Sequence, residues 1–151
     1  LMEGGCSYDG SSDGSDKLYG GDGDDLLVGG AGDDLFDGGV GQDTLTGDGG
    51  IASCGYEASY TQGGASGSDT FVIRAGDGGS SISDADIITD FTDGTDIIGM
   101  SGLNYSDLTI EQGTGSYSSH VVVKKTSSGE FLAIIQNISL SSVDDNDFSA
   151  I

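Results

Sequence analysis

The chain reads GGDGDDLLV over residues 20–28 and GGAGDDLFD over residues 29–37, and the same nine-residue pattern runs through residues 11–46 in four copies. The sixth place of each copy is aspartate, and the eighth is a large apolar residue. Glycine fills places one, two and four, except that the first copy begins with Ser11 and Ser12. A fixed short period that couples one carboxylate to one apolar residue predicts a solenoid whose turns bind a cation.

The repeat predicts short strands joined by glycine-rich turns. Glycine at three of six consecutive places allows backbone angles that other residues resist, and leaves carbonyl groups free to point at a ligand. One apolar residue per copy suits a very short strand with a single inward side chain, so two copies form one full turn of a flattened coil. This arrangement stacks Asp16 over Asp34, and Asp25 over Asp43.

Stacked carboxylates require a cation between them, because at a few ångströms they repel by roughly several kcal/mol at an intermediate dielectric. The repeats offer only carboxylate and carbonyl oxygens, with no His or Cys. That ligand set selects a hard cation of flexible geometry, so calcium fits better than magnesium or zinc. Composition alone would also permit a flexible Gly/Asp-rich linker. A linker, however, has no reason to keep an apolar residue in phase with an aspartate.

The segment resembles the GGxGxDxUx repeats of the RTX (repeats-in-toxin) family, whose members bind calcium in a parallel β-roll. The resemblance implies that each ion lies between two stacked turns. One turn gives its aspartate and the carbonyls of places two and four, and the other gives its aspartate and the carbonyls of places one and three. Carried over to this chain, the first site comprises Ser12, Gly14, Asp16, Gly29, Ala31 and Asp34, and the second comprises Gly21, Gly23, Asp25, Gly38, Val40 and Asp43.

A fifth copy is interrupted. It begins at residues 47–50, and residues 66–72 read as its remainder, with Asp69 at place six and Phe71 at place eight. We therefore expect a surface loop, at about residues 51–65, inserted into a calcium turn. A third site would then use Gly30, Gly32 and Asp34 with Gly47, Gly49 and Asp69. Alternatively, a new unit begins at Gly64, which keeps Asp69 as a ligand and changes the carbonyls.

The segment DIITDF at residues 86–91 closely resembles the end of the β-roll in serralysin-type proteases and in the R-modules of mannuronan epimerases. On this register Asp86 falls at place six and Ile88 at place eight of a last half-turn. Asp86 and Asp90 are therefore candidate ligands, the alternative being solvated acids on a strand edge. We expect the β-roll to span residues 1–91.

Beyond residue 91 the composition favours antiparallel strands, at residues 108–110, 121–123 and 131–135, between Gly/Ser-rich turns. This part resembles the antiparallel cap that closes the β-roll in the same families, and a solenoid needs such a cover on its last coil. The predicted fold is thus all-β: a parallel β-roll capped by a C-terminal antiparallel sheet or sandwich at residues 92–151. The tail, residues 140–151, is similar to the uncleaved C-terminal signals of type I secretion substrates.

The net charge of −22 in 151 residues disfavours binding to nucleic acid or to anionic membranes, and opposes compaction until cations bind. No hydrophobic stretch is long enough to span a bilayer, and no signal peptide is visible at the N-terminus. The chain begins within its repeat pattern, so we expect it to be the end of a longer protein. We also expect a monomer. Cys6 and Cys54 lack metal-ligand spacing, and a disulfide between them suits an oxidising exterior; the alternative is two unpaired residues.

The sequence gives no sign of catalysis. His120 is the sole histidine and precedes a valine run, where a plain strand-edge residue is expected. No Ser/His/Asp arrangement, phosphate loop or zinc spacing appears.

The leading hypothesis is a non-catalytic module that binds several Ca²⁺ ions and folds on calcium outside the cell. The resemblance implies type I secretion machinery as its partner, a Gram-negative bacterium, and a larger secreted or cell-surface parent: an adhesin, toxin or hydrolase. The alternative is a calcium-dependent polysaccharide-binding accessory module of a secreted enzyme.

Overall fold

The computed structural model describes residues 2–3, 14–48 and 67–151, with only the backbone of the first two. Several predictions from the sequence fall outside these residues: the ligands Ser12 and Gly49, the pair Cys6 and Cys54, and the loop at residues 51–65. The described part of the chain is all-β, with its strands in two sheets.

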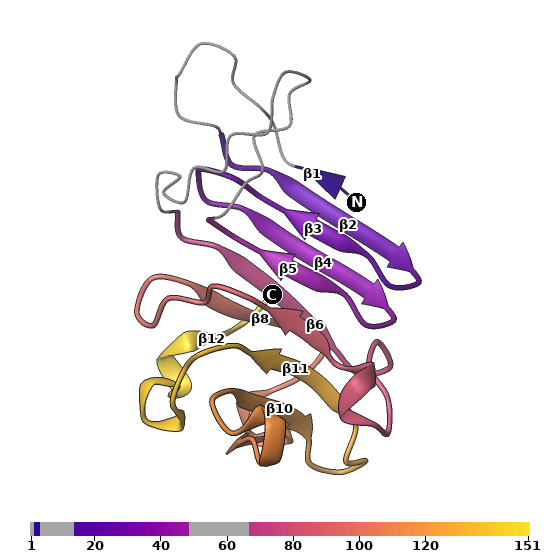
Figure 1. Ribbon diagram of the computed structural model, residues 1–151. Coiled ribbons are helices and arrows are strands. Elements are labelled where there is room, and N and C mark those ends of the chain that lie inside the picture. Colours follow the sequence, from indigo (N-terminus) through magenta and orange to yellow (C-terminus); the bar gives the residue numbers. More distant parts are fainter. Residues whose placement is uncertain (1, 4–13, 49–66) are drawn as a thin grey trace.

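The first sheet has seven strands. In spatial order these are β1 (Met2–Glu3), β3 (Leu26–Val28), β5 (Thr44–Thr46), β7 (Asp86–Ile88), β11 (Phe131–Ile135), β10 (Val121–Lys125) and β9 (Leu108–Gln112). The strands from β1 to β11 pair in parallel, whereas β9, β10 and β11 pair antiparallel. Figure 1 shows the parallel strands stacked in successive coils, with β10 at the end away from β1.

The second sheet has five strands and is parallel throughout. In spatial order these are β12 (Phe148–Ala150), β8 (Ile97–Ser101), β6 (Thr70–Arg74), β4 (Leu35–Val40) and β2 (Lys17–Asp22). Short 3-10 helices lie between strands: η1 (Ile82–Asp84), η2 (Tyr105–Asp107), η3 (Gly115–Tyr117), η4 (Leu140–Ser142) and η5 (Asp145–Asp147). None of the helices in the described residues is long and apolar enough to cross a membrane.

From β1 to β8 the chain alternates between the two sheets, which is the topology of a parallel β-roll. The register follows the repeat, because Leu18 pairs with Phe36 in the second sheet and Leu27 pairs with Leu45 in the first. Two nine-residue copies therefore make one coil. The predicted fold class, a parallel β-roll closed by antiparallel strands, is confirmed.

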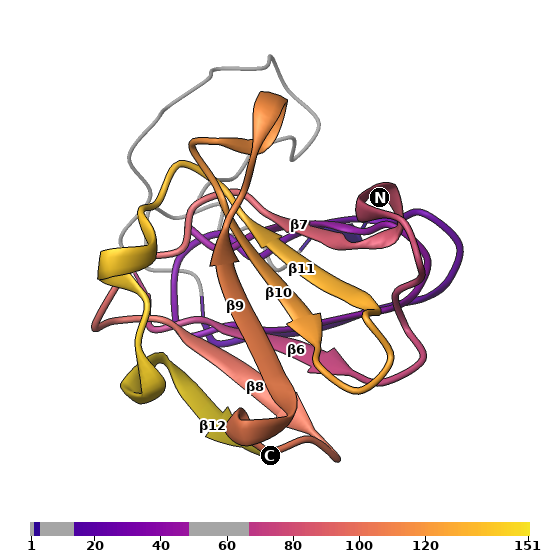
Figure 2. The ribbon, with the colours of Figure 1, turned by 90° about the horizontal axis from the view of Figure 1, so that it is seen from below.

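The core lies between the two sheets, and within the repeats it is built from the apolar residue at place eight of each copy. Figure 2 shows the two layers, with β7 and β11 in one and β6, β8 and β12 in the other. Two stacked rows of buried side chains face each other: Leu18, Phe36, Phe71, Ile98 and Phe148 in the second sheet, and Leu27, Leu45, Ile88, Ile135 and Val121 in the first. Burial of each such side chain stabilises the fold by about 1.5–3 kcal/mol.

Parallel pairing continues beyond residue 91. Strand β8 extends the second sheet after β6, and β12, near the end of the chain, pairs with β8 through Phe148 and Ile98. Among the described residues, β9, β10 and β11 are the strands that pair antiparallel, and β11 joins them to the roll through β7. The division of the chain at residue 91 stays a prediction.

Candidate metal centre

Two rows of aspartates follow the turns of the roll, one along each edge. The first aspartate row precedes strands β2, β4, β6 and β8, and consists of Asp16, Asp34, Asp69 and Asp96. The second aspartate row consists of Asp25 and Asp43, which precede strands β3 and β5, and of Asp86, the first residue of β7. Both rows come from the same rule in the sequence, an aspartate two residues before an inward apolar side chain.

Within each row, the backbone N–H of one aspartate donates to Oδ1 of the aspartate one coil further on. In the first row the N–O distances are 2.8 Å from Asp16 to Asp34, 2.9 Å from Asp34 to Asp69 and 3.0 Å from Asp69 to Asp96. In the second row they are 2.8 Å from Asp25 to Asp43 and 3.1 Å from Asp43 to Asp86. The carboxylates are therefore stacked as the sequence predicts.

Glycine at place one is required by the aspartate at place six of the same copy. A Cβ atom at Gly29 would collide with the carboxylate of Asp34, and one at Gly38 would collide with the carboxylate of Asp43. Each carboxylate thus folds back inside its own turn, against the glycine backbone. This close approach explains why place one tolerates no side chain in these copies.

The predicted second site is brought together by the two stacked turns of copies two and four. Gly21 lies opposite Gly39, and the Gly23 N–H donates to the Val40 carbonyl at 2.7 Å. Gly21 and Gly23 have φ of 102° and 108°, a left-handed conformation that glycine adopts without strain. The residues predicted from copies two and four are therefore neighbours, and ligation by them stays a prediction.

The predicted first and third sites share Asp34. Its carboxylate accepts the Asp16 N–H and its own N–H donates to Asp69. Carbonyl-bearing turns also stack here, because the Gly30 N–H donates to the Gly47 carbonyl at 2.9 Å. The remaining predicted residues in the described part, Gly14, Ala31 and Gly32, lie in the same turns of copies one and three.

The geometry favours the split fifth copy over a new unit that begins at Gly64. A Cβ at Gly47 would collide with the carboxylate of Asp69, just as one at Gly38 would collide with Asp43. Gly47 therefore occupies place one of the copy whose place six is Asp69.

Asp90 lies outside both aspartate rows and contacts the start of the fifth copy. Its Oδ1 accepts the Gly47 N–H at 2.9 Å and its Oδ2 accepts the Asp48 N–H at 3.0 Å. Asp48 in turn accepts the Gly67 N–H at 2.6 Å. Gly67 and Asp48 flank the insertion, so this chain of hydrogen bonds closes the fifth turn at its base. Asp86, in contrast, is a member of the second row.

Burial and mutual repulsion raise the pKa of several of these carboxyls. Burial is the main cause for Asp69, whose pKa rises to about 7, with added repulsion from Asp48, Asp96 and Asp34. Burial also raises the pKa of Asp86 to about 8, with repulsion from Asp43. The pKa values of Asp43, Asp90 and Asp96 rise for the same first reason. A bound cation that replaces the proton stabilises such buried carboxylates in their charged form.

The residues present fit a calcium ion. Asp43 Oδ2 and Asp69 Oδ2 are buried and accept no hydrogen bond from the described residues, which is costly for a carboxylate unless a cation contacts it. In the described part of the chain, no three His, Cys, Asp or Glu side chains cluster as a metal site. Each predicted ligand set has two carboxylates and otherwise uses carbonyl oxygens, the ligands that Ca²⁺ accepts.

Sequence reasoning missed Asp96 and Asp48. Asp96 precedes the inward Ile98 by two residues, as Asp34 precedes Phe36, and that spacing could have revealed it. The glycine pattern of the repeats is absent around Asp96, so its equivalence to the place-six aspartates was not recognised. Asp48 replaces the glycine of place two, and its bond to Gly67 depends on a contact across the insertion that no periodicity reveals.

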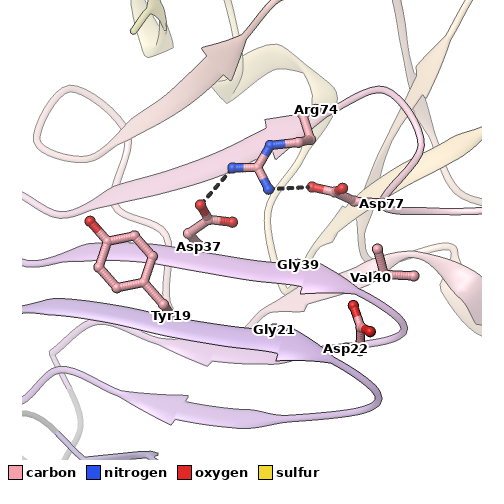
Figure 3. Close-up of a pocket in the computed structure, with 8 residues that line it drawn as sticks. All are labelled: Tyr19, Gly21, Asp22, Asp37, Gly39, Val40, Arg74 and Asp77. Carbon is pink, nitrogen blue, oxygen red and sulfur yellow. Dashed lines mark hydrogen bonds and ion pairs between the residues drawn. The ribbon is translucent and has the colours of Figure 1, made fainter.

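A shallow groove of about 250 Å³ lies on the outer face of the second sheet, lined by Tyr19, Gly21, Asp22, Asp37, Gly39, Val40, Arg74 and Asp77 (Figure 3). Arg74 donates to Asp37 at 2.5 Å and to Asp77 at 3.1 Å. The charge of this guanidinium is therefore compensated by two carboxylates, and Arg74 ties β4 to the turn after β6. Tyr19 presents an exposed ring at one end of the groove.

Stacked glycine turns that carry buried aspartate rows define a calcium-binding β-roll, and the comparisons agree. The family model of the RTX calcium-binding nonapeptide repeat matches residues 11–51, with four copies. This chain therefore contains an RTX-type module, and its repeats bind Ca²⁺. No curated protein matches the chain by sequence.

Two solved structures, both subunits of the Azotobacter vinelandii mannuronan C5-epimerase, are similar to the chain. The AlgE6R2 subunit is 22% identical with a TM-score of 0.52, and the match covers 91% of this chain and 86% of that chain. The AlgE6R3 subunit is 22% identical with a TM-score of 0.48, and the match covers 95% of this chain and 82% of that chain. The likeness to AlgE6R2 supports the fold.

Proposed function

We propose that this calcium-binding module folds when Ca²⁺ binds along the two aspartate rows, and that it does so outside the cell as part of a larger secreted protein. The observation that carries the proposal is the stacking of buried carboxylates: Asp34, Asp69 and Asp96 lie in one row, each 2% exposed or less. Without cations, folding must bring these negative charges together at a buried edge of the roll. With cations, the same arrangement provides a series of stacked binding sites.

The energy of binding is large enough to decide whether the chain folds. A ligand that binds only the folded state at 100 times its dissociation constant adds about 2.7 kcal/mol of stability. Three such sites add roughly 8 kcal/mol, which is comparable with the whole stability of a small domain. Low calcium inside the cell would leave the chain unfolded and able to thread through a channel, and high calcium outside would fold it.

The proposed export route is type I secretion from a Gram-negative bacterium, with an adhesin, toxin or hydrolase as the parent. RTX repeats are typical of secreted proteins, which supports this route. The tail, residues 140–151, is the proposed signal. Its support is the order of its residues, with the acids Asp144, Asp145 and Asp147 ahead of Phe148 and Ile151.

Expression of the chain with its transporter tests the export proposal. A chain truncated after Ser139 should accumulate inside the cell, while the full chain should reach the medium. As a control for stability, Ile98→Ala, which truncates a buried side chain of β8 outside the tail, should weaken the fold and leave export intact, because an export signal is read from the unfolded chain. Normal export of the truncated chain would remove the type I part of the proposal and leave calcium-driven folding standing.

We also propose that the chain is non-catalytic. The ring of His120 supports this, because its Nδ1 accepts the Asn137 N–H at 3.0 Å and so has a structural role in the C-terminal part. Asp34 and Asp43 each accept a backbone N–H group from the neighbouring coil.

A second candidate function is calcium-dependent binding of a polysaccharide. The groove on the second sheet favours it, since Tyr19 is 53% exposed beside the polar groups of Asp37 and Arg74, and an exposed ring can stack on a sugar. Pull-down with immobilised polysaccharides, with and without chelator, tests this candidate. Tyr19→Ala should abolish retention and Leu26→Ala, an exposed apolar residue of β3 in the other sheet, should not. Equal retention of both variants contradicts the candidate.

A further inference from the structure

The segment that leads from β11 to the C-terminal strand is held by two side chains of the antiparallel part. This connector, residues 136–143, runs from β11 through η4 towards β12 (Figure 2). The Asn137 N–H donates to Nδ1 of His120 at 3.0 Å, and the Leu140 N–H donates to Oε1 of Gln112 at 2.8 Å. The two holding residues are themselves joined, because Nε2 of Gln112 donates to the His120 carbonyl at 2.8 Å. The end of β9 and the residue before β10 therefore position the connector.

The bond to His120 requires one protonation state of the ring. A backbone N–H can only donate, so Nδ1 carries a lone pair and the proton of the neutral ring lies on Nε2. A second proton enters at Nδ1, where it faces the Asn137 N–H, so the charged ring cannot accept this bond. The Ser119 hydroxyl, 3.3 Å from Nδ1, can accept the new N–H instead. An unperturbed imidazole gains its second proton at about pH 6.5.

The surroundings of the ring leave its charge free to change. Tyr117 of η3 is a titratable neighbour, edge-on to the ring at 6.3 Å between centroids, and a phenol stays neutral in this pH range. The other residues bonded to His120 are uncharged side chains or backbone groups: Ser119 beside it, Gln112 of β9 and Asn137 of the connector. No ion pair in the described part of the chain includes His120. Protonation of the ring is therefore felt first at the Asn137 bond.

The connector needs this bond because its backbone turns sharply at Asn137. The φ of Asn137 is 55°, the one positive value among the non-glycine residues that the structure describes. This left-handed conformation is unfavourable for residues other than glycine, although asparagine tolerates it better than most. The next residue, Ile138, packs partly buried against the core. Loss of the His120 bond therefore weakens a turn that also places an apolar side chain.

We propose that His120 makes the attachment of the C-terminal segment depend on pH: the neutral ring holds the connector, and the protonated ring releases it. Release loosens η4 and β12, which follow the connector in the chain. The repeats contain no histidine, so the roll itself lacks this response. The inference goes beyond calcium-driven folding, because it concerns acidic surroundings in which calcium is still bound.

Nuclear magnetic resonance of the wild-type chain in saturating calcium gives the first test. At pH 7.5 the ¹⁵N chemical shifts of the His120 ring should show the proton on Nε2. A ring with its proton on Nδ1 would overturn the proposal, because that nitrogen could not accept the Asn137 N–H. This measurement needs no variant, so it decides even if substitutions at His120 prevent folding.

Hydrogen exchange at pH 7.5 and pH 5.5, with His120→Asn and His120→Ala as the matched pair, gives the second test. Exchange rates are divided by those of an unstructured peptide at the same pH. The protection of the Asn137 amide should fall about fivefold in the wild type at the lower pH, as expected for the loss of one hydrogen bond. His120→Asn offers an oxygen acceptor that cannot be protonated and should keep its protection. His120→Ala should be poorly protected at both values.

Two results of the exchange experiment would contradict the proposal. An equal loss of Asn137 protection in the wild type and in His120→Asn would show that another group responds to the acid. An equal loss at the amide of Leu45, in the core of the roll, would show that the response is not confined to the connector.

Discussion

The backbone N–H of Asp34 donates to Oδ1 of Asp69 at 2.9 Å, although 35 residues separate the two aspartates. The equivalent bond from Asp16 to Asp34 spans 18 residues and has a length of 2.8 Å. The row therefore keeps its geometry across the insertion. One coil of this roll therefore ends where an aspartate stacks on the aspartate of the coil before it. The number of residues between the two aspartates can vary.

Asp34 is expected to serve two neighbouring ions, because it is stacked between Asp16 and Asp69. Asp34→Asn keeps an acceptor for the Asp16 N–H but removes the charge. We expect it to destabilise the calcium-bound fold by on the order of 2 kcal/mol, and to raise the calcium concentration needed for folding by more than tenfold. Asp22→Asn, at the exposed end of strand β2, serves as the control and should have little effect. Equal shifts in calcium titrations followed by circular dichroism would refute the assigned register.

Glycine at place one is expected to be essential for the turns. Gly38→Ala places a methyl group against the carboxylate of Asp43, and should cost about 1–3 kcal/mol and weaken calcium-driven folding. Gly14→Ala is the matched control, because a Cβ there meets no other atom within 4 Å. Urea denaturation in saturating calcium measures both variants. If Gly38→Ala were as stable as Gly14→Ala, the close approach of aspartate to glycine would not matter to the fold.

Acid should partly replace calcium. In the absence of metal, the pKa of Asp69 is about 7 and that of Asp86 about 8, above the ordinary value of 3.8. The folded state therefore binds more protons than the unfolded chain. The stability that these groups contribute is fully present below about pH 3.8, and is lost as the pH rises through about 7 and 8.

The β signal in far-ultraviolet circular dichroism, recorded in chelator at pH 5 and at pH 8, measures this dependence. The metal-free chain should be more folded at pH 5, and Asp69→Asn should reduce the difference, because the substitution removes one of the groups whose pKa is raised. Greater stability at pH 8 in chelator would be the opposite of the expected sign.

The C-terminal segment is expected to stabilise the roll without binding ions. Phe148 is 8% exposed, extends the apolar row of the second sheet and packs edge-on against Tyr105 at 5.1 Å between ring centroids. Phe148→Ala should therefore lower the free energy of unfolding by about 3 kcal/mol, as measured by urea denaturation in calcium. The number of bound ions should stay unchanged, and Ser149→Ala, at an exposed position of the same strand, should be neutral. A loss of ions in Phe148→Ala would show that the segment belongs to a metal site.

Most of the roll could be predicted from the sequence, because the repeat states the side-chain periodicity of the fold directly. Asp34 and Phe36 keep a fixed spacing, and that spacing alone places one on the edge and the other in the core. The antiparallel strands β10 and β11 were equally visible as runs of β-branched and aliphatic residues. Local pattern was sufficient for these elements because each depends on residues near in sequence.

The remainder depends on contacts between distant residues. The pairing of β12 with β8 joins residues about fifty positions apart, and a three-residue strand at the chain end has no periodicity of its own. Asp90 was predicted to be a candidate ligand, and the structure places both of its oxygens on backbone N–H groups of Gly47 and Asp48. These bonds depend on the stacking of the Asp90 turn on the turn that contains Gly47 and Asp48. The repeat pattern does not specify that stacking, because the insertion interrupts it there.

Calcium titration of the purified chain, followed by far-ultraviolet circular dichroism, tests the central claim most directly. In chelator at neutral pH the chain should lack β signal. Millimolar calcium should produce it cooperatively, and magnesium at the same concentration should do little, because Mg²⁺ demands tight octahedral geometry and dehydrates reluctantly. A chain with the same β signal in chelator and in calcium would contradict the claim that cations along the aspartate rows drive the folding of this roll.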